Sequence, residues 1–90
     1  MSVLALPQRL THADAQALVD GWTARLPAAA DGVLTLDAQS LAVFDSSAVA
    51  AILALRRLAI AQGARLCVMA CPPRLMALAD LYGVADWFRP

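Results

Sequence analysis

Short apolar runs alternate with longer helix-forming stretches along this chain, and the alternation limits the folds that it can adopt. Each run is short and apolar, which is typical of a buried strand, and a stretch with helical periodicity follows it. The predicted strands are residues 2–6, 33–37 and 65–70, and the predicted helices are residues 11–26, 46–62 and 73–82. This order predicts an α/β fold, with helices packed on a mostly parallel or mixed sheet.

Local signals mark the ends of these elements. Thr11 offers an N-cap hydroxyl, and Asp14 follows three residues later as an approximate capping box. Gly63 stands where a C-terminal cap of the second helix is expected. Two prolines at 72–73 can open the third helix. Residues 41–44 are predicted to form a further extended piece.

Two apolar groups are expected near the C-terminus. The third helix carries an apolar stripe, and an aromatic pair follows it. The stripe consists of Leu75, Leu78, Ala79 and Tyr82, and the pair is Trp87 and Phe88. We expect the stripe to face the core and the pair to add a large apolar patch at the end of the chain.

Composition excludes several classes of protein. The 90 residues suffice for one small domain, 1–90. With 61% hydrophobic and 16% charged residues, the chain is not intrinsically disordered. Seven Arg balance seven Asp, giving a formal net charge of zero. Because no basic excess is available to neutralise phosphates, nucleic-acid binding and polybasic membrane attachment are not expected.

The apolar residues are not arranged as a membrane span. The longest stretch without a charge is Ser46–Leu55, whereas a spanning helix needs about 20 apolar residues. Arg9 interrupts the N-terminus early, so a signal peptide is not expected. We therefore predict a cytoplasmic protein with no direct membrane insertion. A domain so small cannot bury all of its apolar side chains, which indicates that a partner covers some of them.

No metal or cofactor site is predicted. Cys67 and Cys71 lack a second pair of ligands, and His12, the sole histidine, is distant in sequence. Both cysteines are interpreted as small buried hydrophobic residues in a reducing compartment. No glycine-rich phosphate loop is present, so nothing supports a nucleotide site.

Asp45, Ser46 and Ser47 lie where the extended piece ends and the long helix begins. Asp and Ser are preferred N-cap residues, and spacing alone favours this structural role. The alternative is a hydroxyl exposed at a helix N-terminus, where the helix dipole favours an added phosphate. A nucleophilic serine needs a base and an orienting acid. His12 is the sole candidate base, so we expect no enzymatic activity.

The long helix carries two apolar faces. The first suits packing on a sheet, and its members are Ala48, Ala51, Ile52, Leu55 and Ala59. A second ridge, formed by Val49, Leu53 and Ile60, lies about a quarter-turn away beside Arg56 and Arg57. Two interpretations remain open. Either its own domain buries the helix on two sides, or the ridge is a docking surface with arginines at its edge.

The chain resembles the STAS domain family. The resemblance rests on the run Val33-Leu34-Thr35-Leu36-Asp37, on Asp45-Ser46-Ser47-Ala48-Val49 before a long helix, and on Arg65-Leu66-Cys67-Val68-Met69. The segment through Tyr82-Gly83-Val84 to Trp87-Phe88 continues it, so the match extends from about Leu4 to the end. It implies a single small STAS-like domain that acts by binding another protein.

Two branches of the STAS family resemble this chain. Anti-sigma-factor antagonists are phosphorylated on a serine, here Ser47, and bind a kinase-like anti-sigma factor; Ala48 replaces their usual glycine. The other branch is the small STAS subunit of the Mla phospholipid-transport ABC system. It binds the ATPase subunit of the transporter, and a hydroxyl residue, here Ser46, lies at the interface.

The second branch is favoured by the brief N-terminal strand, by the Leu10-Thr11 opening of the first helix and by the total length. Because the second ridge of the long helix is apolar, edged by arginine and not needed for the sheet-facing stripe, we expect the partner to bind there and at the preceding loop. The expected binding residues are Asp45, Ser46, Ser47, Val49, Leu53, Arg56 and Arg57. The second branch also places the protein at the inner membrane only through the transporter complex.

Overall fold

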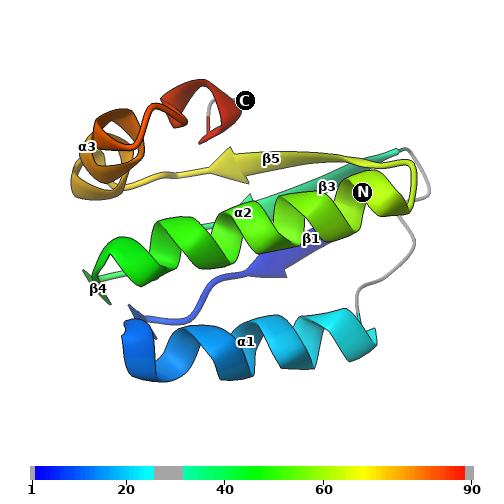
Figure 1. Ribbon diagram of the computed structural model, residues 1–90, viewed down its shortest axis with the longest axis horizontal. Helices are drawn as coiled ribbons and strands as arrows, with labels where there is room; N and C mark the ends of the chain where they lie inside the picture. Colours follow the sequence, from blue (N-terminus) through cyan, green and yellow to red (C-terminus); the bar gives the residue numbers. More distant parts are fainter. Residues whose placement is uncertain (1, 26–31, 89–90) are drawn as a thin grey trace.

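The computed structural model describes residues 2–25 and 32–88. Strands and helices alternate in the predicted order, with one very short strand near residue 10 that was not predicted (Figure 1). The elements are β1 (Ser2–Ala5), β2 (Arg9–Leu10), α1 (His12–Arg25), β3 (Val33–Asp37), β4 (Val43–Phe44), α2 (Ser46–Ala61), β5 (Arg65–Met69), α3 (Pro73–Leu81) and the 3-10 helix η1 (Ala85–Phe88). The predicted α/β class is confirmed. The expected end of the first helix at Leu26 lies outside the described residues.

The main sheet is parallel. Its strand order is β1-β3-β5, so β3 is the central strand. Leu4 of β1 pairs with Leu36 of β3, which in turn pairs with Val68 of β5. Parallel pairing requires a crossover between neighbouring strands, and α1 and α2 provide it. The prediction of a mostly parallel sheet is therefore confirmed.

A second, two-stranded sheet pairs β2 with β4, also in parallel. The predicted extended piece at 41–44 is present but shorter, at Val43–Phe44. Its partner, Arg9–Leu10, was not predicted, because a strand of two residues leaves no periodic signal in the sequence. Each of these strands leads directly into a helix, β2 into α1 and β4 into α2.

One face of the main sheet packs against the helices. Alternation along β3 and β5 turns every second side chain toward α2. Figure 1 looks onto this side, with α2 drawn in front of the strands. The buried strand residues are Leu34, Leu36, Leu66 and Val68, and the buried α2 residues include Ala48, Ala51, Ile52, Leu55 and Ala59. The predicted sheet-facing stripe of α2 is therefore confirmed.

The helix ends follow the sequence signals, except at the start of α1. α2 ends at Ala61, and Gly63 follows in the left-handed region at φ +76, where L side chains are strained. At α1, the carboxylate of Asp14 accepts the Thr11 N–H at 3.2 Å. The Thr11 hydroxyl also donates to this carboxylate, at 2.8 Å, instead of accepting a bond from the helix. Only the carboxylate half of the predicted capping box is thus present.

The C-terminal segment differs from the prediction. Leu75 and Ala79 of α3 are buried as expected, but Tyr82 is 54% exposed. α3 ends at Leu81 and Tyr82 is its C-cap residue, so the side chain leaves the helical stripe. Phe88 is only 1% exposed and joins the core, so it contributes no surface patch. The side chain of its predicted companion, Trp87, lies outside the described part of the structure.

The cysteines are less buried than predicted. Cys67 and Cys71 are both half-buried free thiols. Partial burial raises the pKa of the Cys71 thiol above its usual value. Among residues 2–25 and 32–88, none of the helices has the length and apolar character needed to span a membrane.

Candidate partner-binding site

The first turns of α1 and α2 lie side by side. β2 and β4 pair in parallel, with Leu10 opposite Phe44. Because a helix follows each strand almost at once, pairing of the strands brings the two helix N-termini together. The sequence separates these N-termini by more than thirty residues, so this proximity arises from the fold alone.

A single carboxylate connects the two helix starts. Oδ1 of Asp45 accepts the backbone N–H of Ser47 at 2.9 Å, which is the N-cap bond predicted for α2. Oδ2 of the same side chain accepts the backbone N–H of His12 at 3.1 Å, in the first turn of α1. Asp45 therefore caps both helices. These bonds, led by the one from Ser47 and followed by the one from His12, hold the pKa of Asp45 below its usual value.

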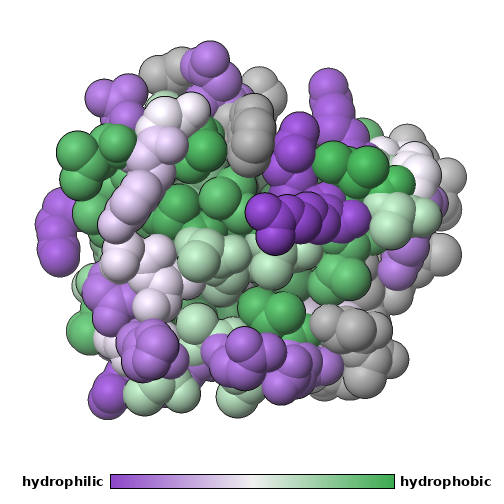
Figure 2. Space-filling model, viewed as in Figure 1, coloured by the Kyte–Doolittle hydropathy of each residue, from purple (hydrophilic) through white to green (hydrophobic). Residues whose placement is uncertain are grey.

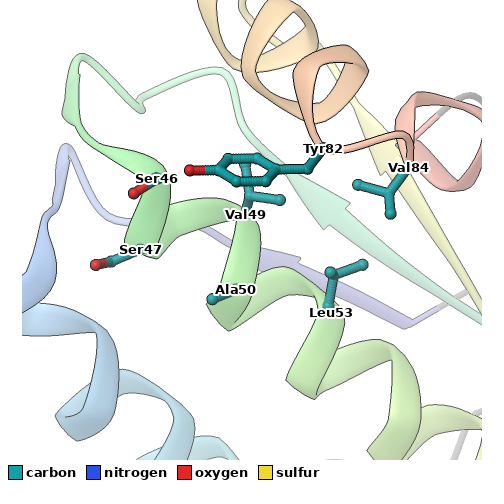
Figure 3. A pocket seen from close by; sticks show the side chains of 7 residues that line it. All are labelled: Ser46, Ser47, Val49, Ala50, Leu53, Tyr82 and Val84. Carbon is teal, nitrogen blue, oxygen red and sulfur yellow. The ribbon is translucent and has the colours of Figure 1, made fainter.

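Ser46 and Ser47 begin α2 at the molecular surface. Ser46 is exposed and Ser47 is half-buried. Figure 3 shows both hydroxyls pointing outward from the first turn of the helix. The orphan backbone N–H groups of this turn and the hydroxyls together provide polar contacts at the end of an otherwise apolar helix.

A hollow of roughly 440 Å³ lies between the start of α2 and the segment after α3. Tyr82 forms one wall: in Figure 3 its ring lies across Val49, with the phenolic oxygen directed toward Ser46. None of the described residues that line this hollow is charged. They are Ser46, Ser47, Val49, Ala50, Leu53, Tyr82 and Val84.

A second groove of roughly 380 Å³ follows the line between α1 and α2. Small alanines form most of the α2 side, and His12 is the one ionisable residue among the described residues that line the groove. The lining residues are His12, Ala15, Gln16 and Val19 from α1, and Ser47, Ala50, Ala51 and Ala54 from α2. Ser47 and Ala50 line both hollows, so they form a low ridge between them. Figure 2 shows apolar side chains gathered across the centre of this face, over α2.

The geometry does not assemble a nucleophile with an activated base. His12 and Ser47 line the same groove, but the oxygens of Asp45 accept backbone N–H groups and not the imidazole. Within the described ranges, the His12 ring makes no hydrogen bond that would orient it. No three His, Cys, Asp or Glu side chains come together there to hold a metal ion.

Comparison with known proteins identifies the family. The family model described as "Mlab, STAS domain" matches residues 1–90. The chain belongs to this STAS family. No curated protein sequence matches the chain.

The STAS fold is also evident from a solved structure, that of the anti-sigma factor antagonist SpoIIAA in its unphosphorylated form. The two structures superpose with a TM-score of 0.76 at 20% sequence identity, over 96% of this chain and 75% of that one. At this identity the similarity shows a shared fold.

In this STAS domain, the predicted ridge on α2 is only partly a surface feature. Val49 is 2% exposed and belongs to the core, so it is not available as a free docking residue. Leu53 is half-buried: it packs against the core and also lines the first hollow. Arg56 is half-buried and Arg57 is exposed. Val49 differs from the prediction because Tyr82 and Val84, from a distant segment, flank it (Figure 3).

Sequence reasoning missed several residues of the STAS surface. Tyr82 was assigned to the apolar stripe of the third helix, and Val84, Ala50 and the α1 side of the groove were not predicted to belong to a binding surface. One signal for Tyr82 was present. Gly83, at φ +73, marks the end of α3, and a residue just before such a glycine need not follow the helical stripe.

Proposed function

We propose that this STAS domain is a non-catalytic interaction subunit that binds the cytoplasmic ATPase of a phospholipid-transport ABC complex and regulates or stabilises it. The observation that carries the proposal is the surface around Ser46 and Ser47, where two apolar hollows meet. The Mla-type family model favours an ABC ATPase as the partner. The domain then acts in the cytoplasm and reaches the inner membrane only through the transporter.

The hollows suit a protein partner better than a charged small molecule. Among the residues that the structure describes, none that lines the first hollow carries a formal charge, so these residues offer no counterion for an ionic ligand. Apolar side chains of a partner would gain from filling it, and the two serines provide hydrogen bonds at its end. Arg57, exposed further along α2, suits the polar edge of such an interface.

The identity of the partner is tested by affinity purification from native cells followed by mass spectrometry. We expect recovery of an ABC ATPase together with its permease. Recovery of a histidine-kinase-like ATPase instead would reject the transporter and support the second candidate described below.

The binding surface is tested by titrating variants against the recovered ATPase. Ala50 is exposed and lines both hollows, so Ala50→Arg should block them without disturbing the core. Ala61→Arg is the matched control, because Ala61 is exposed at the opposite end of the same helix. Unchanged affinity of Ala50→Arg would show that the partner uses another surface.

The serines are tested separately. Ser46→Ala removes a hydroxyl contact and should weaken binding by about 0.5–1.5 kcal/mol. Ser46→Glu or Ser47→Glu introduces a charge into a contact that excludes water, at a cost of several kcal/mol if it stays unpaired. Ser40→Ala, in an exposed turn away from both hollows, is the control.

The absence of catalysis is part of the proposal. Within residues 2–25 and 32–88, the His12 ring makes none of the orienting hydrogen bonds that a general base requires. We expect the pure protein to hydrolyse neither ATP nor esters. Activity that disappears in the Ser46→Ala, Ser47→Ala double variant would refute this expectation.

A second candidate is an anti-sigma factor antagonist that works by phosphorylation of Ser47 and exchange of partners. Its support is the fold shared with SpoIIAA and the surface position of Ser47 at the start of α2. Ala48, which replaces the usual glycine, is fully buried, so its methyl group does not obstruct an approaching kinase. Phosphate incorporation by a recovered kinase, lost in Ser47→Ala, would favour this candidate.

A further inference from the structure

The face of the main sheet that points away from α2 is open. Alternation places one set of side chains on this face, opposite the buried leucines and valine. The set forms two full rows across the sheet, Val3–Thr35–Cys67 and Ala5–Asp37–Met69, and a shorter row of Val33 and Arg65. At the edge strands Val3 is 44% exposed and Met69 is 42% exposed.

Such an open face is unusual for a parallel sheet. Parallel sheets occur almost only with both faces covered. Here α1 and α2 lie on one side, and the row through Thr35 on the other carries no charge. The middle of this face is thus uncharged, and the described residues of the chain do not cover it.

The charges on this face are complementary to each other. Asp37 stands at the carboxyl end of the central strand, and Arg65 at the amino end of β5. One oxygen of Asp37 accepts the Gln39 N–H at 2.9 Å, and the Arg65 guanidinium has no ion-pair partner within the described residues. An acid and a base therefore lie on opposite sides of an uncharged middle row.

We propose that a second copy of this chain covers this face, sheet against sheet. A two-fold axis parallel to the row Val3–Thr35–Cys67, midway between the two sheets, would set the strands of the two copies antiparallel. Asp37 of each copy would then lie next to Arg65 of the other, and the interface would hold two such pairs. A formal net charge of zero means that the two copies do not repel each other at long range.

The small area of the face limits the strength of this dimer. Three strands of four or five residues span only about 15 Å in each direction. A stable interface covers about 800 Å² on each partner. We therefore expect reversible dimerisation in the micromolar to millimolar range. The proposed ATPase-binding surface is on the opposite side of the domain, across α1 and α2. An experiment can therefore reject the dimer and leave the proposed partner binding intact, or the reverse.

Sedimentation equilibrium over a range of concentrations tests the dimer, and charge exchange tests its geometry. Arg65→Asp alone places two acids together at each contact and should weaken the dimer at least tenfold. Asp37→Arg alone places two bases together and should do the same. An equimolar mixture of the two variants restores an acid–base pair at both contacts, so it should form a mixed dimer.

Crosslinking tests the two-fold axis. In a Cys71→Ser background, Cys67 of each copy would face Cys67 of the other across sheets about 10 Å apart. This separation is too long for a disulfide, but a short bismaleimide should link the copies. Thr35→Arg should abolish the crosslink, whereas Ile60→Arg, on the exposed side of α2, should not.

Three outcomes would overturn the proposal. The first is a monomer at all concentrations up to the millimolar range. The second is a dimer that Arg65→Asp and Thr35→Arg leave unchanged. The third is failure of the mixed variants to associate although melting curves show both to be folded. The melting curve is needed above all for Asp37→Arg, because this change also removes the hydrogen bond from the Gln39 N–H.

Discussion

The backbone N–H of His12 donates to Oδ2 of Asp45 over 3.1 Å, which joins the start of α1 to the residue that caps α2. The other oxygen of Asp45 accepts the N–H of Ser47 at 2.9 Å. One exposed side chain thus sets the relative position of two helix N-termini. The residues that donate these two bonds, His12 and Ser47, both line the groove between α1 and α2, so Asp45 fixes one end of the candidate binding surface.

Loss of one or both hydrogen bonds to Asp45 should destabilise the domain by increasing amounts. Asp45→Asn keeps one carbonyl oxygen and can satisfy only one of the two N–H groups, whereas Asp45→Ala satisfies neither. We expect the melting temperature to fall modestly in Asp45→Asn and by several degrees in Asp45→Ala. Asp80→Ala, an exposed acid on α3, should cause no fall. Equal melting temperatures for Asp45→Asn and Asp45→Ala would contradict a role for both oxygens.

Acid should weaken the same cap. Hydrogen bonds, first from Ser47 and then from His12, hold the pKa of Asp45 below its usual value of 3.8. A carboxyl with a lowered pKa in the folded state contributes its full stability above its unfolded-state pKa, and loses it as the pH falls through the folded-state value. We expect the melting temperature of the natural sequence to fall more steeply below pH 4 than that of Asp45→Ala. Parallel slopes would show that Asp45 is not the group responsible.

The order and type of the main elements could be predicted, because periodicity and end signals are local. Gly63 marks the end of α2, and the spacing of the apolar residues before it predicts which side of the helix faces the sheet. The pairing of Leu10 with Phe44 could not be predicted, because strands of two residues show no period. The contact between Asp45 and His12 depends on that pairing, and it could not be anticipated either.

The candidate binding surface was predictable only in part. Ser46 and Ser47 were recognised because a hydroxyl at a helix start follows from sequence alone. Val49 was misassigned to the surface, since the residues that flank it, Tyr82 and Val84, come from another segment. A helical periodicity shows which residues share a face, but it does not show whether a distant segment covers that face.

The buried position of Val49 leads to a stability prediction. Val49→Ala removes two carbon groups from the core and should lower the free energy of unfolding by about 2 kcal/mol, of which about 1.6 is transfer and the rest a small cavity. Ile60→Ala, on the same helix but exposed, should change it by less than about 0.5 kcal/mol. Urea denaturation measures both. Equal effects of the two variants would place Val49 at the surface after all.

Substitution of Tyr82 should separate binding from stability. Its ring is more than half exposed, so Tyr82→Ala should leave the melting temperature nearly unchanged. The same change removes a wall of the hollow next to Ser46, so affinity for the ATPase partner should fall about tenfold or more, as for an aromatic residue at an interface. Tyr82→Phe keeps the wall and removes only the phenolic oxygen, which in Figure 3 points toward Ser46. It should therefore lose far less affinity than Tyr82→Ala.

Leu81→Ala is the control for Tyr82→Ala, because Leu81 is the more exposed neighbour and lies outside this hollow. If Tyr82→Ala binds normally while Ala50→Arg does not, the partner occupies the groove between α1 and α2 and leaves the hollow beside Tyr82 empty.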